Sequence, residues 1–342
     1  MWPSGLLLHM NGSLLIDNHG RKINYLRLAV TDKCNLRCFY CMPEDGLHWL
    51  SRTELMSYEE MLRSCSLLVK MGIEKIRITG GEPFVRKDIM QLLAAISQLD
   101  GLKELSLTTN GVLTAPHVPE LKRIGVRSVN LSLDTLDANR FFTITRRDEF
   151  AQVMATLEAL LKHGIEVKIN AVVMDGKNTQ DILPLVQMTK ELPVSVRFIE
   201  EMPFNGDGHV YTGLQWDYIR ILEEIKSHYP QIQKLPDPSY STAYNYQIPG
   251  HQGTVGIIAA YSRTFCGTCN RIRITPQGEL KTCLYDDGGL NMKAMMRTGA
   301  NDDELQTVLL NAVNHRAKDG WEAERTRVVH LGIHESMATI GG

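Results

Sequence analysis

Six of the seven cysteines fall into two tight groups that could bind metal. The first triplet is Cys34, Cys38 and Cys41, and the second triplet is Cys266, Cys269 and Cys283. A secreted disulfide framework prefers an even number of cysteines in a much shorter chain, so these groups indicate metal or cluster ligation in a reducing compartment. Neither triplet has a fourth cysteine, and a 4Fe–4S cluster held by three thiolates keeps one iron open. The spacing therefore predicts two metal or cluster sites.

Other uses of these thiols stay open at this point. A tetrahedral zinc ion wants four ligands, and His48 is the only close candidate to complete the first triplet. The second triplet, spaced C-x2-C-x13-C, is also compatible with a zinc ribbon that has a non-cysteine fourth ligand. Cys65 stands apart, because it recurs at helical spacing with Met61 and Leu68 and is predicted to be a small buried hydrophobe.

Alternating strands and helices must position the first triplet. Strands are expected over residues 24–31, 75–79, 104–108, 128–133, 166–173 and 194–199, and helices over residues 57–71, 87–99, 116–124, 149–163 and 179–191. Strict alternation predicts an α/β fold of right-handed parallel βαβ units, closed or partly closed into a barrel with the helices outside. A doubly wound open sheet is the alternative, but no G-x-G-x-x-G motif follows the first strand. The first triplet follows that strand directly, at the edge where barrel enzymes place their chemistry.

Polar side chains alternate along three of these strands. They are Lys75, Arg77 and Thr79, then Asn130, Ser132 and Asp134, and then Lys168 and Asn170. Because side chains along a strand alternate between its two faces, each set shares one face, and in a barrel that face points into the lumen. An ordinary solvated edge strand would explain any single set, but agreement across three strands favours a polar interior that faces a ligand.

The pattern changes after residue 200. A Gly-, Pro- and Tyr-rich stretch over residues 203–213 precedes an expected helix over 215–228, and irregular sequence is expected until strands at 271–275 and 279–284. We expect an N-terminal extension over residues 1–20, a barrel over 21–204 and a smaller C-terminal domain over 205–342 that carries the second triplet. Residues 1–15 have no periodic pattern. Arg271 and Arg273 alternate on the strand that leaves the second triplet, so both guanidiniums point the same way and suit a phosphate or triphosphate.

The composition of the chain excludes several classes of protein. The 342 residues carry 37 Lys and Arg against 39 Asp and Glu, a net charge of -2, which disfavours non-specific nucleic-acid binding. No apolar run approaches the roughly 20 residues that span a bilayer. Residues 1–20 contain no Lys or Arg to open a signal peptide. We therefore expect a cytoplasmic protein with neither a membrane nor a nucleic acid as its partner.

Two motifs on consecutive strands carry a family resemblance. The C-x3-C-x2-C spacing, with aromatic Tyr40 just before its third cysteine, and Gly80-Gly81-Glu82-Pro83 after the next strand resemble the radical S-adenosylmethionine superfamily. The resemblance implies that the open iron chelates the amine and carboxylate of S-adenosylmethionine. One-electron reduction would then cleave that cofactor to a 5′-deoxyadenosyl radical.

Further motifs narrow the resemblance. Residues 25–32, the sequence Cys-x-x-Cys-Asn-Arg-x-Arg at the second triplet and the terminal Gly341-Gly342 are similar to the GTP 3′,8-cyclase family of molybdenum cofactor biosynthesis, over residues from about 16 to the last. The implied fold is an incomplete (βα)6 radical S-adenosylmethionine barrel whose lateral opening is covered by a C-terminal domain with a second 4Fe–4S cluster. The implied reaction takes hydrogen from the ribose 3′ carbon of GTP and joins that carbon to guanine carbon 8, giving 3′,8-cyclo-7,8-dihydro-GTP.

The resemblance also implies roles for single residues. Both triplets would ligate clusters, and S-adenosylmethionine would contact Tyr40, Gly81, Ser132 and Met202. Residues that would contact GTP are Arg27, Arg77, Thr108, Lys168, Arg197, Arg271 and Arg273. Within that set Arg27, Arg271 and Arg273 are expected to serve catalysis together with Gly341 and Gly342, which would form a mobile tail that reaches into the site. Ala29 stands where the family often has Ser, a change expected to be harmless.

Partners follow from the same resemblance. GTP would be the substrate, an external donor would supply electrons, a separate cyclic pyranopterin monophosphate synthase would take the product onward, and a homodimer is expected. Two alternative functions remain. One is another radical S-adenosylmethionine enzyme with an auxiliary cluster, such as a peptide maturase. The other is a non-catalytic iron–sulfur electron carrier, which would need neither Gly-Gly-Glu-Pro nor a polar lumen.

Overall fold

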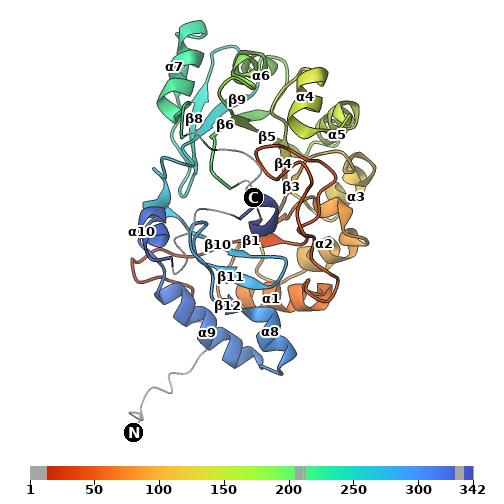
Figure 1. The fold of residues 1–342 in the computed structure, drawn as a ribbon, viewed down its shortest axis with the longest axis vertical. Helices are drawn as coiled ribbons and strands as arrows, with labels where there is room; N and C mark the ends of the chain where they lie inside the picture. Colours follow the sequence, from red (N-terminus) through yellow and green to blue (C-terminus); the bar gives the residue numbers. More distant parts are fainter. Residues whose placement is uncertain (1–13, 205–210, 212, 328–334, 342) are drawn as a thin grey trace.

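A computed structural model describes residues 14–204, 211, 213–327 and 335–341. Its strands in these residues form one sheet in the order β12-β11-β10-β1-β2-β3-β4-β5-β6-β9-β8-β7 (Figure 1). The strands are β1 Tyr25–Ala29, β2 Lys75–Thr79, β3 Glu104–Thr109, β4 Ser128–Ser132, β5 Glu166–Val173, β6 Ser195–Glu200, β7 Gln233–Lys234, β8 Ala243–Gln247, β9 Thr254–Ile258, β10 Arg271–Ile274, β11 Glu279–Lys281 and β12 Leu290–Asn291. The α-helices are α1 Tyr58–Lys70, α2 Ile89–Ser97, α3 Val118–Arg123, α4 Ala138–Thr145, α5 Phe150–Lys162, α6 Ile182–Met188, α7 Tyr218–His228, α8 Met292–Arg297, α9 Asp302–Asn314, α10 Gly320–Arg325 and α11 Met337–Ile340.

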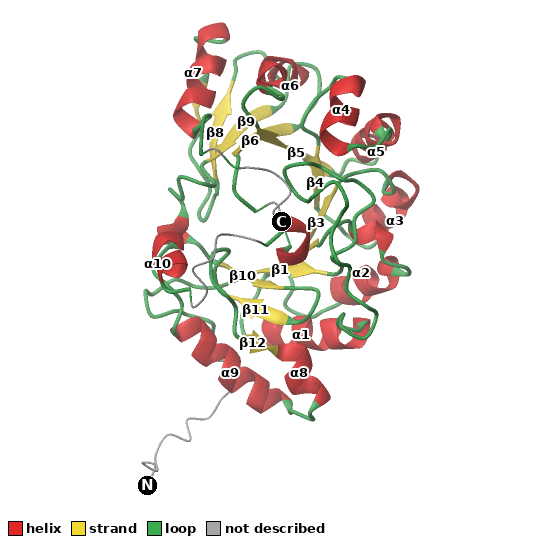
Figure 2. Ribbon diagram, in the orientation of Figure 1, coloured by secondary structure: helices red, strands yellow, loops and turns green. Residues whose placement is uncertain are grey.

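Strands β1 to β6 are parallel and follow one another in sequence order. Helices α1 to α6 lie on the outer side of the curved sheet (Figure 2). In the described residues β12 and β7 are the two edges of the sheet, so the barrel is open. The predicted incomplete βα barrel is confirmed, and the closed and doubly wound forms are wrong.

Burial of one face of each helix explains why these segments fold as they do. Ser57 caps the start of helix α1: its hydroxyl accepts from the Glu60 amide, while the Glu60 carboxylate accepts from the Ser57 amide. Its inner face packs Met61, Cys65 and Leu68 at 0% exposure into the main core. The prediction that Cys65 is a small buried hydrophobe is confirmed, and burial raises the pKa of its thiol to about 12.

Helix α4 was not predicted from the sequence, yet it holds the first cysteine loop. It begins at Asp137, whose carboxylate accepts from the Arg140 amide. At its other end the carbonyls of Thr145 and Ile144 accept from the backbone amides of Arg37 and Phe39 at 2.9 and 3.1 Å. The loop that carries Cys34, Cys38 and Cys41 is therefore tied to the helix that follows β4.

Strands from the second half of the chain extend the same sheet at both edges. The predicted strands at 271–275 and 279–284 are confirmed as β10 and β11, but the prediction of irregular sequence before them is wrong. Strand β9 pairs in parallel with β6, and β10 pairs in parallel with β1. Strand β8 mixes polar and aromatic residues, and Gly256 interrupts β9, so neither strand has a clear alternation in sequence. The domain boundary at residue 204 stays a prediction.

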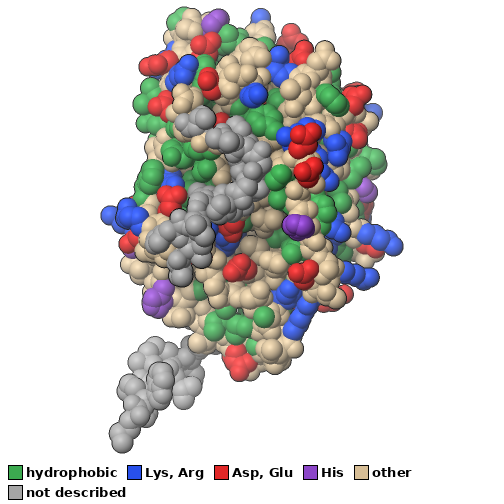
Figure 3. Space-filling model, in the orientation of Figure 1, with side chains coloured by type: hydrophobic (Ala, Val, Ile, Leu, Met, Phe, Trp, Pro, Cys, Tyr) green, Lys and Arg blue, Asp and Glu red, His purple; other side chains and the backbone are tan. Residues whose placement is uncertain are grey.

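The remaining sequence expectations concern the termini and the surface. Residues 1–13 and most of the stretch 203–213 lie outside the described residues, but Leu15 is 1% exposed and its amide donates to the Met71 carbonyl at 3.1 Å. No helix in the described part of the chain is long and apolar enough to cross a membrane. Acidic and basic side chains lie intermixed on the face shown in Figure 3.

The junction of β6 and β9 allows a test of this shared sheet. A Cβ on Gly253 would lie 2.2 Å from the Val194 carbonyl oxygen, which cannot move without breaking the sheet. We expect Gly253→Ala to lower the free energy of unfolding by about 3 kcal/mol in urea titrations followed by circular dichroism. Gly250→Ala is the matched control, because Gly250 has φ +84° with open space around it and should lose only about 1 kcal/mol. Equal losses in the two variants would contradict the packing of β9 against β6.

Candidate active site

The predicted site residues surround a single cavity of about 560 Å3 inside the curve of the sheet. Its lining includes both cysteine triplets, the four residues expected to contact S-adenosylmethionine and the seven expected to contact GTP. Among the residues predicted to face the lumen, Thr79 alone is absent from that lining. The structure thus brings together residues that are up to about 250 positions apart in the sequence, from Arg27 to Cys283.

The C-terminal residues lie beside this cavity. Gly341 has φ +75°, and a Cβ there would lie 2.7 Å from Thr79 Oγ1, so its backbone packs closely against β2. Its carbonyl accepts from Arg273 Nη1 at 2.6 Å. Gly342 lies outside the described residues. The predicted approach of the chain end to the site is therefore observed for Gly341.

The Gly-Gly-Glu-Pro turn holds the first cysteine loop from the β2 side. The amides of Gly81 and Glu82 donate to the carbonyls of Thr31 and Lys33 at 2.7 and 2.8 Å. A Cβ on Gly81 would lie 2.3 Å from the Lys33 carbonyl oxygen, so only glycine allows this close approach. Glu82 is fully buried, and burial raises the pKa of its carboxyl to about 7.

The thiols of the first triplet lie in a buried environment with acidic neighbours. Burial, followed by the charge of Glu82, raises the pKa of Cys34 to about 12. Burial and then the charge of Asp134 raise the pKa of Cys38. Asp134 itself accepts from the Tyr40 hydroxyl at 2.8 Å, and burial raises its pKa to about 6. Without a cation these thiols stay protonated, so metal binding here must displace protons.

A row of guanidiniums crosses the sheet next to the cysteine loops. The register pairs Arg273 of β10 with Arg27 of β1, and Arg27 with Arg77 of β2. Burial first, and then neighbouring positive charge, lowers the pKa of Arg27 and brings the pKa of both Arg273 and Arg197 to about 10. These side chains repel one another, so an anion bound among them would be strongly stabilised.

Unsatisfied polar atoms point to the same region. In the described part of the chain, several residues that line the cavity have a buried side-chain atom with no hydrogen-bond partner, and these atoms include Thr108 Oγ1, Asn130 Oδ1, Asn170 Oδ1, Arg197 Nε and Asn270 Oδ1. Buried polar groups are nearly always hydrogen-bonded, so a cluster of exceptions in one cavity indicates a polar ligand.

The second triplet lies in a more cationic environment than the first. Burial alone raises the pKa of the Cys269 thiol, but the charges of Arg271 and Arg316 outweigh it and lower that pKa to about 6. Burial raises the pKa of Cys283 to about 11. The Asp286 carboxylate accepts from the backbone amides of Thr282 and Cys283, each at 2.8 Å, and so holds the loop of the third cysteine.

The donor sets fit iron–sulfur clusters better than zinc. Tetrahedral zinc requires several side chains that converge on one ion. In the described ranges, no group of three or more His, Cys, Asp or Glu side chains is placed to hold a single metal ion. The six cysteines of the triplets form no disulfide, and the thiols of each triplet lie near enough to affect one another's pKa. A cubane cluster binds each thiolate at a different iron, so its ligands need not converge on one ion.

Sequence reasoning did not place every residue of the site. Lys75 was predicted to face the lumen but not to contact GTP, although it lines the cavity beside Arg77 and pairs with Glu104 at 2.7 Å. Arg316, which also lines the cavity, was missed altogether. No motif or periodicity marks Arg316, since it follows α9 and only the fold brings it to Cys269.

The fold, the three-cysteine loop after β1 and the Gly-Gly-Glu-Pro turn after β2 together define a radical S-adenosylmethionine protein. Residues 28–189 match the family model described as Radical SAM superfamily, and residues 194–321 match the model described as Molybdenum Cofactor Synthesis C. The structure is also similar to Streptococcus suis SuiB bound to S-adenosylmethionine, with a TM-score of 0.60 and 16% identity over 92% of this chain and 69% of that one. At this identity the likeness concerns the fold alone.

The particular family follows from closer relatives. The chain is 39% identical over 335 residues to the GTP 3′,8-cyclase of Desulforamulus reducens, covering 96% of this chain and 100% of that one. It is 41% identical over 307 residues to molybdenum cofactor biosynthesis protein 1 of Bos taurus, covering 90% of this chain but 48% of that one, so it spans about half the length of this relative. The chain belongs to the GTP 3′,8-cyclase family. The cofactors of that family are S-adenosylmethionine and two 4Fe–4S clusters.

The contact of Gly81 with Lys33 predicts a specific loss of iron. We expect Gly81→Ala to push the first cysteine loop aside, so that the reconstituted protein retains about half of its iron and sulfide. Gly267→Ala is the matched control in the second cysteine loop, because no atom lies within 4 Å of a Cβ placed there. Full iron content in Gly81→Ala would show that the turn does not hold the first loop.

Proposed function

We propose that this protein cyclises GTP to 3′,8-cyclo-7,8-dihydroguanosine 5′-triphosphate, an early step of molybdenum cofactor biosynthesis. The observation that carries the proposal is the joint presence of two cysteine triplets and a buried arginine row on one cavity. Relatives of matching length are named GTP 3′,8-cyclase. Bound at the first cysteine triplet, a cluster with S-adenosylmethionine would supply the radical chemistry for removal of hydrogen from the ribose 3′ carbon.

Different parts of the lining would hold the cofactors. Cys34, Cys38 and Cys41 would ligate the first cluster, and Cys266, Cys269 and Cys283 the second. The residues proposed to contact S-adenosylmethionine are Tyr40, Gly81, Ser132 and Met202. Asp134 supports this placement, because its carboxylate accepts a hydrogen bond from the Tyr40 hydroxyl just after the end of β4. The Tyr285 hydroxyl donates a hydrogen bond to the Met202 sulfur at 3.7 Å and so orients that side chain.

The charge of the cavity favours a triphosphate as the substrate's anionic part. Eight lysine and arginine side chains line the cavity against three carboxylates, so its interior is strongly positive. The cations are Arg27, Lys75, Arg77, Lys168, Arg197, Arg271, Arg273 and Arg316. Arginine binds phosphate oxygens in a bidentate manner, and a buried cluster of this kind holds a polyanion with little reorganisation. Thr108 would donate from its unsatisfied hydroxyl to the same ligand.

Enclosure and positioning are the chain's own contribution to the chemistry. The sheet would surround the reacting atoms, and α11 with Gly341, whose carbonyl accepts from Arg273, would cover them. An alkyl radical reacts with any hydrogen donor nearby, so exclusion of water and fixed placement of the ribose supply much of the rate. Arg27, Arg271, Arg273, Gly341 and Gly342 would act in catalysis by holding the triphosphate and closing the site.

The proposal also includes the role of the second cluster, the partners of the reaction and the oligomeric state. The open iron of the second cluster would face the guanine base. An external donor would supply the electrons, and a cyclic pyranopterin monophosphate synthase would consume the product. We propose a homodimer that works in the cytoplasm.

A peptide maturase is the second candidate, since the chain shares its fold with SuiB, which has also been solved bound to the precursor peptide SuiA. The row of Arg273, Arg27 and Arg77 favours a nucleotide instead, because a peptide groove has no need of buried guanidiniums in register. An electron carrier is disfavoured by the same cavity, which is large enough for a small substrate and polar where it should bind one.

Substitution of the arginines beside the second triplet tests the substrate. We expect Arg271→Ala and Arg273→Ala each to lower the rate of GTP cyclisation by at least about 100-fold, because each removes a buried charged donor to the triphosphate. Iron content should stay at the parent level. Arg220→Ala on α7 is the control, since its guanidinium stacks on Trp216 at 4.2 Å and should not affect turnover. Unchanged turnover in Arg271→Ala and Arg273→Ala would contradict triphosphate binding here.

A further inference from the structure

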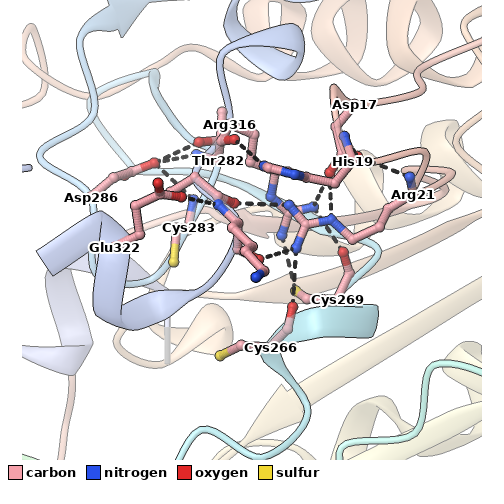
Figure 4. Close-up of polar contacts among 12 residues, drawn as sticks. Asp17, His19, Arg21, Cys266, Cys269, Thr282, Cys283, Asp286, Arg316 and Glu322 are labelled. Carbon is pink, nitrogen blue, oxygen red and sulfur yellow. Dashed lines mark hydrogen bonds and ion pairs between the residues drawn. The ribbon is translucent and has the colours of Figure 1, made fainter.

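A buried carboxylate joins two arginines behind the second cysteine triplet (Figure 4). Asp17 precedes β1, and its side chain is 0% exposed. Its Oδ2 accepts from Arg21 Nε at 2.6 Å and lies 3.7 Å from Arg316 Nη1. Its Oδ1 accepts from the amides of His19 and Arg21 at 3.0 and 2.9 Å. One carboxylate therefore fixes both guanidiniums, although the residues are almost 300 positions apart.

Each arginine reaches a different cysteine of the C-x2-C loop. Arg21 Nη1 donates to the Cys266 carbonyl at 3.1 Å. Arg316 Nη1 donates to the Cys269 carbonyl at 2.8 Å, and its Nη2 points at the Cys269 sulfur at 3.0 Å. Figure 4 shows both guanidiniums approaching the loop from the same side. The two contacts differ in kind, because Arg21 bonds the backbone alone whereas Arg316 also bonds the thiol.

Burial of these two guanidiniums costs free energy, so some interaction must offset it. Arg316 is 3% and Arg21 8% exposed, and buried charges are expensive unless they are paired and hydrogen-bonded throughout. Arg21 meets this condition with carbonyls, since it also donates to Lys318 and Ala317 at 2.6 and 2.8 Å. Arg316 instead directs one donor at a sulfur atom, a weak acceptor while it is a thiol and a strong one as a cluster ligand.

We propose that Arg316 is a positioning residue that donates a hydrogen bond to the Cys269 ligand of the second cluster and raises the reduction potential of that cluster. Asp17 holds the guanidinium in place, and Arg21 holds the loop. Reduction adds one electron to the cluster, and a positive donor at a ligand sulfur stabilises the more negative state. Arg271 approaches Cys269 too, but it belongs to the proposed GTP site, whereas Arg316 is fixed by the protein behind the loop. The inference rests on the proposed second cluster.

The test measures the second cluster alone. Cys34, Cys38 and Cys41 are replaced by Ala in the full-length chain, and the remaining cluster is reconstituted and titrated with reductant while its EPR signal is followed. We expect Arg316→Gln, which is neutral and shorter, to shift the potential to a more negative value with parent iron content. Arg21→Gln is the matched control, because Arg21 shares Asp17 but bonds the cysteine loop only at the Cys266 carbonyl, so the potential of this variant should equal that of the parent. Arg316→Lys, which retains the charge, should shift the potential less than Arg316→Gln.

Every other result decides against the proposal. An unchanged potential in Arg316→Gln with a complete cluster would overturn it, as would equal shifts in Arg316→Gln and Arg21→Gln. Failure of both Arg316 variants to load iron would also overturn it, because the side chain would then serve to retain the ligand loop. Absence of a cluster from the parent with the three Ala substitutions would instead contradict the second cluster of the proposed function.

Discussion

Repulsion among arginines buried in register is the constraint on which the rest of the molecule depends. Parallel pairing places Arg273, Arg27 and Arg77 side by side across β10, β1 and β2. Each loses hydration and gains like-charged neighbours, an arrangement that only an anion or a rigid surrounding fold can stabilise. The carbonyl of Gly341 accepts a hydrogen bond from Arg273, and all three arginines line the cavity. The row thus connects the sheet and the chain end to the proposed substrate site.

The second half of the chain completes the site by joining both edges of the sheet. Strand β10 beside β1 brings Arg271, Arg273 and the second triplet next to the first. Strand β9 pairs with β6 and extends the other edge of the sheet, where Arg197 lies opposite Gly256. A Cβ on Gly256 would lie 3.1 Å from Arg197 Cγ, so the two residues pack closely. Because strands from both halves share one hydrogen-bonded sheet, the two cysteine loops are held at fixed positions across one cavity. The proposed radical reaction between two clusters would need such rigid placement.

Much of this could be predicted from the sequence, because the signals were local. The cysteine spacings, the Gly-Gly-Glu-Pro turn and the period-two polarity of β2, β4 and β5 each lie within one short segment of the chain. The six parallel strands followed from their alternation with helices. What failed was non-local. Strand β9 is recognisable only through its pairing with β6, and α4 is an additional eight-residue helix between β4 and α5, outside the alternation of strands and helices. Arg316 contacts the Cys269 sulfur only because the chain after α9 lies beside the second triplet in the folded protein. No pattern in the sequence predicts that proximity.

In the proposed reaction, the fold, the clusters and the arginine row must work together when hydrogen is transferred from GTP to the adenosyl group. The most direct measurement is an anaerobic turnover of the reconstituted protein with S-adenosylmethionine, dithionite and GTP deuterated at the ribose 3′ carbon, followed by mass analysis of the 5′-deoxyadenosine formed. Incorporation of deuterium is the expected result, since the cavity would hold that carbon against the radical. Unlabelled 5′-deoxyadenosine formed in the presence of bound GTP would contradict the proposal, because the radical would then act on another atom or another substrate.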